Sequence, residues 1–141
     1  IMSLPSINRI GPLIVRAIAN RSLSLLDRAY HDTSLISEET IEGYTQPFRV
    51  RHWDVAFWEF LKATEDLDLT ERLDDLGVPV LVITGDDDRI VPTADSIQVA
   101  SLIPGAELIV IPACGHVPQE ECPEEFMRAA AEFLKNRLSG E

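Results

Sequence analysis

Two short apolar segments most constrain the fold of this chain. Val78–Thr84 and Glu107–Ile111 are rich in β-branched residues, and the first has no charged side chain. This composition is typical of strands that are covered on both faces, as in a parallel sheet. Between them, residues 93–102 have a helical composition that ends before Pro104 and Gly105. Because a strand, a helix and a second strand form a right-handed crossover unit, the sequence predicts two parallel strands.

Each predicted strand is followed by a loop that carries a candidate catalytic side chain. Asp88 lies in the loop after the first strand, and His116 lies in the loop after the second. Loops at the carboxyl ends of parallel strands meet at one edge of the sheet, so we expect the two side chains to converge. A carboxylate bound to one imidazole nitrogen fixes the tautomer of the ring, and the other nitrogen can then accept a proton. The last helix is predicted to start at Pro123.

The first half of the chain is predicted to be a set of short helices. Apolar residues recur at helical spacing from Pro12 to about Tyr30, whereas residues 1–9 are expected to be irregular. Ser37 is a good N-cap for a helix that runs to about Tyr44. A further helix is expected from Pro47 to about Ala63, followed by an acidic connector over residues 65–75.

The charge and composition of the chain exclude several classes of partner. Its 141 residues are enough for one ordinary core, and 45% hydrophobic with 26% charged residues is a globular composition. A net charge of -12 argues against nucleic acid or an anionic membrane surface as partner. There is no membrane-length apolar run, and Ile1–Pro12 lacks the pattern of a signal peptide. We therefore expect a cytoplasmic protein, and two cysteines make no disulfide framework.

Other interpretations of the candidate residues stay open at this stage. The run Asp86–Asp88 could be ordinary turn residues, or it could bind a hard cation such as calcium or magnesium. His116 could be a surface histidine, as we expect of His31 and His52. Cys114, His116 and Cys122 could suggest zinc, but their spacing lacks a Cys-x-x-Cys pair and a fourth ligand, so we expect no metal there and take Cys114 as a small core residue.

The order of these motifs resembles the end of the α/β-hydrolase family. The matching residues are a Val78-Pro79-Val80-Leu81 strand, Gly85-x-x-Asp88-x-x-x-Pro92, a second strand, and Gly115-His116-x-Pro118-x-x-Glu121-x-Pro123-Glu124-x-Phe126. In that family the acid follows the seventh strand and the histidine follows the eighth, and Asp88 and His116 fall at those positions. The resemblance implies an α/β fold, with a helical cap over residues 1–70 and a β-α-β-α part of the core over residues 71–141.

The resemblance also implies a nucleophile, which these 141 residues do not contain. The family carries it on a Gly-x-Ser-x-Gly elbow or an Asp or Cys variant, and no such elbow occurs in the sequence. We therefore expect the chain to be the C-terminal portion of a hydrolase of a small apolar ester, or of a related carbon–carbon, epoxide or halide bond. No cofactor is required. The alternative is a non-catalytic module that associates through an open sheet edge, as a homodimer or with a missing N-terminal chain.

The aromatic residues of the first half are candidates for contact with a small-molecule substrate. Trp53 and Trp58 lie in the predicted cap, where they could line a pocket or simply pack between helices. Tyr44 is a further candidate, because epoxide-opening members of the family use cap tyrosines. We name Tyr44, Trp53 and Trp58 as candidate substrate-binding residues.

Overall fold

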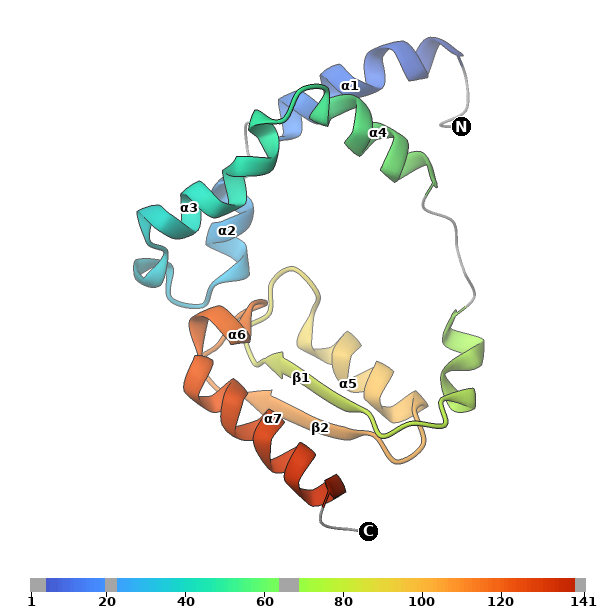
Figure 1. The fold of residues 1–141 in the computed structure, drawn as a ribbon, viewed down its shortest axis with the longest axis vertical. Coiled ribbons are helices and arrows are strands. Elements are labelled where there is room, and N and C mark those ends of the chain that lie inside the picture. The colour runs from blue at the N-terminus through green and yellow to red at the C-terminus, as the bar shows by residue number, and fades with distance from the viewer. Residues whose placement is uncertain (1–4, 20–22, 64–68, 139–141) are drawn as a thin grey trace. The chain divides into compact units, whose positions relative to one another are not determined.

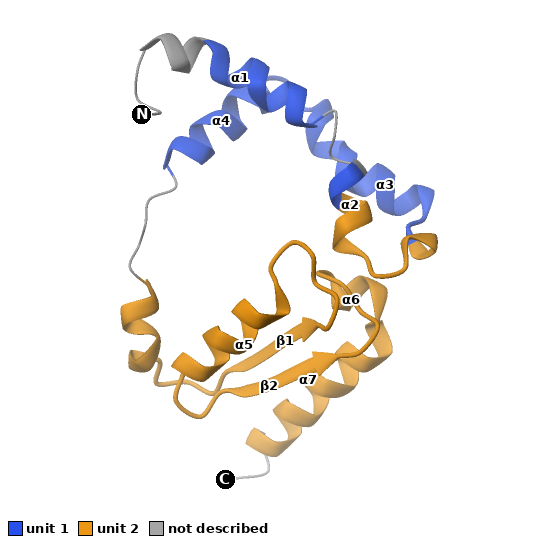
Figure 2. Ribbon diagram, turned by 180° about the vertical axis from the view of Figure 1, so that it is seen from behind, with its two compact units in different colours: residues 1–25, 36–67 blue, residues 26–35, 68–141 orange. Residues whose placement is uncertain are grey.

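The computed structural model describes residues 5–19, 23–63 and 69–138. The chain divides into two compact units, which are coloured separately in Figure 2. Unit 1 comprises residues 1–25 and 36–67, and unit 2 comprises residues 26–35 and 68–141. The division at residue 70 expected from the sequence places residues 26–35 with the first part, whereas the structure groups them with the second.

Unit 1 is built on two helices that pack against each other, α1 (Pro5–Ala19) and α4 (Trp53–Ala63), as Figure 1 shows. Trp58 of α4 is the buried centre of this packing, with only 5% of its surface exposed. Gly11 of α1 lies directly against it: a Cβ at Gly11 would stand 2.1 Å from the indole Cε2. The absence of a side chain at Gly11 therefore allows the close approach of the two helices.

The start of the first helix differs from the prediction. Residues 1–9 were expected to be irregular, but α1 already begins at Pro5 and contains Pro12 in its interior. Proline inside a helix removes a backbone hydrogen bond, which sequence rules penalise. Packing of α1 on α4 compensates for that loss, and such tertiary contacts are invisible to local rules. The predicted continuation to Tyr30 is a separate helix, α2 (Leu23–Ala29).

The second and third predicted helices have mixed outcomes. Ser37 caps α3 (Glu38–Thr45) as expected, since its hydroxyl oxygen accepts the backbone N–H of Thr40 at 3.0 Å. The helix predicted from Pro47 instead starts as a short 3-10 turn, η2 (Gln46–Arg49), and α4 begins only at Trp53. His52 separates them, because its φ of 60° is a left-handed conformation that no right-handed helix accommodates.

Unit 2 contains the predicted crossover. Strands β1 and β2 are parallel, with Leu81 opposite Glu107 and Gly85 opposite Ile111. Helix α5 joins them, and Figures 1 and 2 together show α5 and α7 on opposite sides of the two strands. The elements are η1 (Thr33–Leu35), η3 (Leu69–Asp75), β1 (Leu81–Gly85), α5 (Thr93–Leu102), β2 (Glu107–Ile111), α6 (Pro118–Glu121) and α7 (Pro123–Leu138).

The prediction for the strands holds in outline and fails in two details. The first strand starts at Leu81 rather than Val78, which is consistent with the missing backbone N–H of Pro79. The second strand is less covered than expected, since Ile109 and Val110 are 38% and 37% exposed. Within the described residues the sheet has two strands, so β2 has a neighbour on one edge only. None of the described helices is long and apolar enough to cross a membrane.

Candidate active site

Asp88 and His116 meet at the carboxyl ends of the two strands. Asp88 lies in the loop after β1 and His116 in the loop after β2, and the Oδ2 atom of Asp88 is 2.9 Å from Nδ1 of His116. Because Gly85 and Ile111 are partners in the parallel register, the two loops start side by side. The predicted convergence is thus confirmed, while the chemical role of the pair remains a proposal.

The carboxylate of Asp88 is held firmly by its own loop. Its Oδ1 atom accepts the backbone N–H groups of Ile90 at 2.9 Å and of Val91 at 2.8 Å. The side chain is only 5% exposed, whereas that of His116 is 36% exposed. Two backbone donors on one oxygen direct the other oxygen at the imidazole. With Nδ1 bound to Asp88, Nε2 is the ring nitrogen that can exchange a proton with a ligand.

The neighbouring aspartates have partners of their own. Oδ1 of Asp86 accepts the backbone N–H of Cys114 at 3.4 Å. Asp87 binds Nδ1 of His31 at 2.8 Å and also accepts from Arg89. These hydrogen bonds, from Arg89 first and then from His31, hold the pKa of the Asp87 carboxyl below its usual range. The expected surface position of His31 agrees with its 41% side-chain exposure, and Asp86 is exposed as well. The folded loops add hydrogen-bond partners to both residues and to Asp87.

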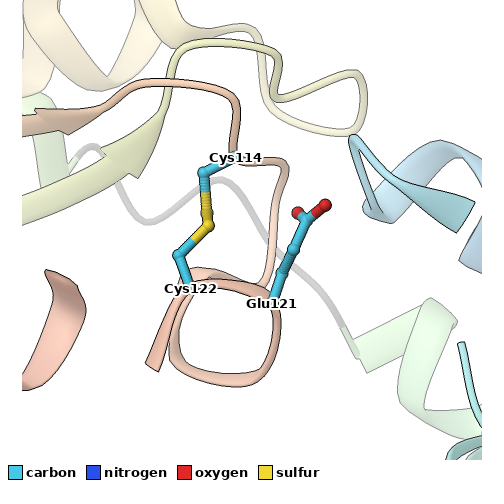
Figure 3. A group of neighbouring side chains, drawn as sticks. All are labelled: Cys114, Glu121 and Cys122. Atoms are coloured by element: carbon cyan, nitrogen blue, oxygen red, sulfur yellow. A yellow bond between two sulfur atoms is a disulfide. The ribbon is translucent and has the colours of Figure 1, made fainter. Parts of the chain in front are cut away.

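The two cysteines are joined, which the sequence analysis did not predict. Figure 3 shows the disulfide between Cys114 and Cys122, with the side chain of Glu121 beside it. The sulfur and carboxylate atoms of these three residues lie within 4.8 Å of one another, a spacing that could suggest a metal site. However, the sulfurs bond each other, both oxygens of Glu121 accept backbone N–H groups, and Nδ1 of His116 binds Asp88. The protein itself thus uses these donors, and we assign no metal to them.

The histidine loop is seated on residues 29–32, which sequence reasoning missed. The backbone N–H of His116 donates to the carbonyl oxygen of Ala29 at 2.6 Å. A Cβ on Gly115 would lie 2.3 Å from that same oxygen, so glycine permits this contact. The tyrosine that follows Ala29 donates its hydroxyl hydrogen to Glu120 at 2.8 Å. Partners so distant in the chain leave no local pattern, although Glu121 does stand out as an acid in the histidine motif.

Gly115→Ala is expected to lower the free energy of unfolding by about 3 kcal/mol, at the upper end of the usual cost of overpacking. The added methyl would meet backbone atoms, the Ala29 oxygen at 2.3 Å and the His31 nitrogen at 2.9 Å, and backbone cannot rotate away. Urea denaturation followed by tryptophan fluorescence and circular dichroism measures the change. The matched control is Gly43→Ala in α3, which has nothing within 4 Å and should gain up to about 1 kcal/mol. Equal stability of Gly115→Ala and the parent would contradict the seating of the loop.

A separate aromatic groove lies in unit 1. It has a volume of about 550 Å³ and an almost entirely apolar lining. The rings of Phe48 and Trp53 form part of its wall, with their centroids 4.8 Å apart. Of the three candidate substrate-binding residues, Tyr44 and Trp53 line this groove, while Trp58 is buried under Gly11. The lining residues are Tyr44, Pro47, Phe48, Val50, Trp53, Ala56, Phe57 and Phe60.

The sequence of this chain matches a known protein family. A family model described as the alpha/beta hydrolase family matches residues 2–129. The chain belongs to the α/β-hydrolase family. This membership agrees with the parallel crossover of unit 2 and with the place of Asp88 and His116 after its two strands. It extends the likeness from the motifs of the second half to most of the chain.

Similar proteins within the α/β-hydrolase family are hydrolases. The chain is 37% identical over 106 residues to the uncharacterised hydrolase YugF of Bacillus subtilis, covering 74% of this chain and 38% of that protein. It is 29% identical over 133 residues to a 2-hydroxy-6-oxononadienedioate/2-hydroxy-6-oxononatrienedioate hydrolase of Comamonas testosteroni, and the match covers 88% of this chain and 46% of that protein. A solved thermophilic esterase is similar at a TM-score of 0.68 and 25% identity, over 90% of this chain and 50% of that one. The chain therefore spans less than half the length of these two curated relatives.

Proposed function

We propose that this chain supplies the acid and the base of a hydrolase whose nucleophile lies outside these 141 residues. The observation that carries the proposal is the hydrogen bond of 2.9 Å between Oδ2 of Asp88 and Nδ1 of His116, at the ends of adjacent parallel strands. A buried carboxylate on one imidazole nitrogen and an accessible second nitrogen are the two features that a general base needs.

In the proposed reaction, Nε2 of His116 takes the proton from the nucleophile as it attacks the substrate, and returns it to the leaving group. For a hydroxyl nucleophile this forms an acyl-enzyme, and His116 then takes a proton from the water that attacks the acyl carbon. It returns this proton to the oxygen of the nucleophile as the bond to the acyl group breaks and the carboxylic acid is released. Asp88 accepts the Nδ1–H hydrogen bond throughout and stabilises the imidazolium, without being protonated itself. The two backbone N–H groups on its other oxygen keep the carboxylate oriented while the charge on the ring changes.

The proposed substrate is a small, fairly apolar ester, and a related carbon–carbon bond is the nearest variant. The aromatic groove of unit 1 supports an apolar ligand, because its lining includes no charged side chain. We propose that Tyr44 and Trp53 contact this ligand, and we do not carry Trp58 forward because it is buried. The names of the relatives include both an esterase and a hydrolase of an oxo-dienedioate, which act on small molecules.

The test is hydrolysis of nitrophenyl esters by a longer protein, in which this chain follows the segment that carries the nucleophile. We expect turnover by the longer protein and only the buffer rate with these 141 residues alone. The kcat/KM for nitrophenyl butyrate should exceed that for nitrophenyl acetate by about tenfold, because burial of two more methylene groups contributes about 1.6 kcal/mol of binding free energy. A longer protein that hydrolyses neither esters nor carbon–carbon substrates would refute the proposal.

A second candidate function is a non-catalytic module that pairs through its sheet edge. The exposed Ile109 and Val110 of β2 favour it, since an apolar edge strand is a template for pairing with another chain. The partner would be a second copy of this chain or an N-terminal chain of the same protein. Turnover in the ester assay would show that the module, even if it pairs, is also part of an enzyme.

A further inference from the structure

Glu121 is a buried carboxylate to which the proposed reaction assigns no role. It is 8% exposed, and both of its oxygens are engaged. Oε1 accepts the backbone N–H of Asp32 at 2.7 Å, and Oε2 accepts the backbone N–H of Gly115 at 2.6 Å. Burial of a carboxylate is costly unless it is hydrogen bonded, and short bonds from two backbone donors are the kind that offset this cost. The two hydrogen bonds therefore allow the Glu121 carboxylate to be buried, and they tie it to two backbone segments of unit 2.

The two bonds of Glu121 link the histidine loop to residues 29–32. Gly115 immediately precedes His116, and Asp32 lies at the end of the segment on which the loop is seated. The N–H of His116 donates directly to the Ala29 oxygen at 2.6 Å, whereas the N–H of Gly115 is linked to the same segment through Glu121. Figure 3 shows that Glu121 and Cys122 extend together from the end of α6 toward the loop, where the disulfide adds a covalent link to Cys114.

The place of the His116 backbone determines whether its ring can reach Asp88. The Asp88 carboxylate is fixed by Ile90 and Val91, so it cannot follow a displaced ring. The hydrogen bond between the two side chains selects the tautomer with the proton on Nδ1, and that choice leaves Nε2 free to act as base. A shift of about 1 Å in such a constellation is enough to lower its efficiency strongly. A residue that holds the Gly115–His116 backbone thus controls the tautomer of the ring.

We propose that Glu121 is a positioning residue, which holds the loop so that His116 donates from Nδ1 to Asp88. It touches neither substrate nor the reacting atoms, and it acts through the backbone N–H of Gly115. The proposal rests on the proposed function only in that the Asp88–His116 pair is taken as the acid and base. Its test uses the tautomer of His116, which can be measured in these 141 residues without turnover.

The experiment is long-range ¹H–¹⁵N NMR of the histidine rings at neutral pH, in the parent, in Glu121→Gln and in Glu124→Gln. The parent should show His116 with its proton on Nδ1. Glu121→Gln keeps the length of the side chain but replaces one acceptor with an NH₂ group that faces a backbone N–H, so one bond is lost. We expect the Nδ1–H population of His116 to fall by roughly threefold or more, toward the Nε2–H form that free imidazole side chains prefer. Glu124→Gln, at an exposed position in the first turn of α7, should leave the tautomer unchanged.

Several outcomes decide the proposal. Faster hydrogen exchange of the Gly115 amide in Glu121→Gln, with His116 still fully on Nδ1, overturns the positioning role and leaves the proposed function intact. A parent protein with His116 on Nε2 has no Asp88 bond to protect, which overturns both. If Glu121→Gln does not fold, as judged by circular dichroism, Glu121→Asp takes its place, because it keeps the charge but is too short for both bonds. The same loss of the Nδ1–H form is then expected.

Discussion

Replacement of His116 by alanine is expected to lower the kcat/KM of the longer protein for nitrophenyl esters by at least about 10³-fold. The ring is the proposed proton acceptor, and no other histidine of this chain binds Asp88 in the described structure. The fold should be unaffected, because the ring is 36% exposed and the loop is held through its backbone. Steady-state assays with purified proteins of equal circular dichroism measure the effect.

The control for this variant is His52→Asn. His52 lies in unit 1 at a φ of 60°, a conformation that asparagine accepts more readily than alanine. We expect its kcat/KM to stay within about twofold of the parent, as for surface substitutions away from a site. If His116→Ala turned over substrate at the parental rate, the assignment of His116 as the base would be wrong, whatever the result for His52→Asn.

Asp88→Asn is expected to reduce kcat by about 10⁴-fold, with little loss of stability, as for a triad acid whose loss imposes the wrong tautomer. The asparagine Oδ1 can still accept the N–H groups of Ile90 and Val91, so the loop keeps its shape. Its NH₂ group then faces His116 and must donate, which places the ring proton on Nε2. The nitrogen that should accept the proton of the nucleophile is then already protonated. Pre-steady-state and steady-state kinetics on the longer protein measure this loss.

Asp87→Asn is the matched control, because it changes the adjacent carboxylate. Asp87 is paired with His31 and Arg89 and does not bind His116 in the described structure. Its kcat should therefore stay within about threefold of the parent, since a partly exposed ion pair contributes little. Similar losses in both aspartate variants would mean that the loop as a whole matters, and that Asp88 has no special role as the acid.

Local pattern predicted much of unit 2. The bounds of β2, α5 and the start of α7 at Pro123 match the prediction, because apolar runs, a proline and a glycine act on their own neighbours. The meeting of Asp88 and His116 was also predictable, since parallel pairing alone brings the two loops to one edge. Prediction was weaker in unit 1, where the interior Pro12 of α1 and the break at His52 depend on packing and on backbone conformation.

The amino-acid sequence thus predicts the α/β class, the two parallel strands and the two residues that we propose as the acid and the base. Each of these follows from residue types at short spacing, which act through propensity and through the geometry of neighbouring strands. Only the folded chain shows that Glu121 accepts the backbone N–H groups of Gly115 and Asp32. The same is true of the pairing of His31 with Asp87. The bonds of Glu121 with Asp32 and of His31 with Asp87 join groups far apart in sequence. A backbone N–H is the same in every residue but proline. Nothing in the residue types marks which of them a distant carboxylate will bind.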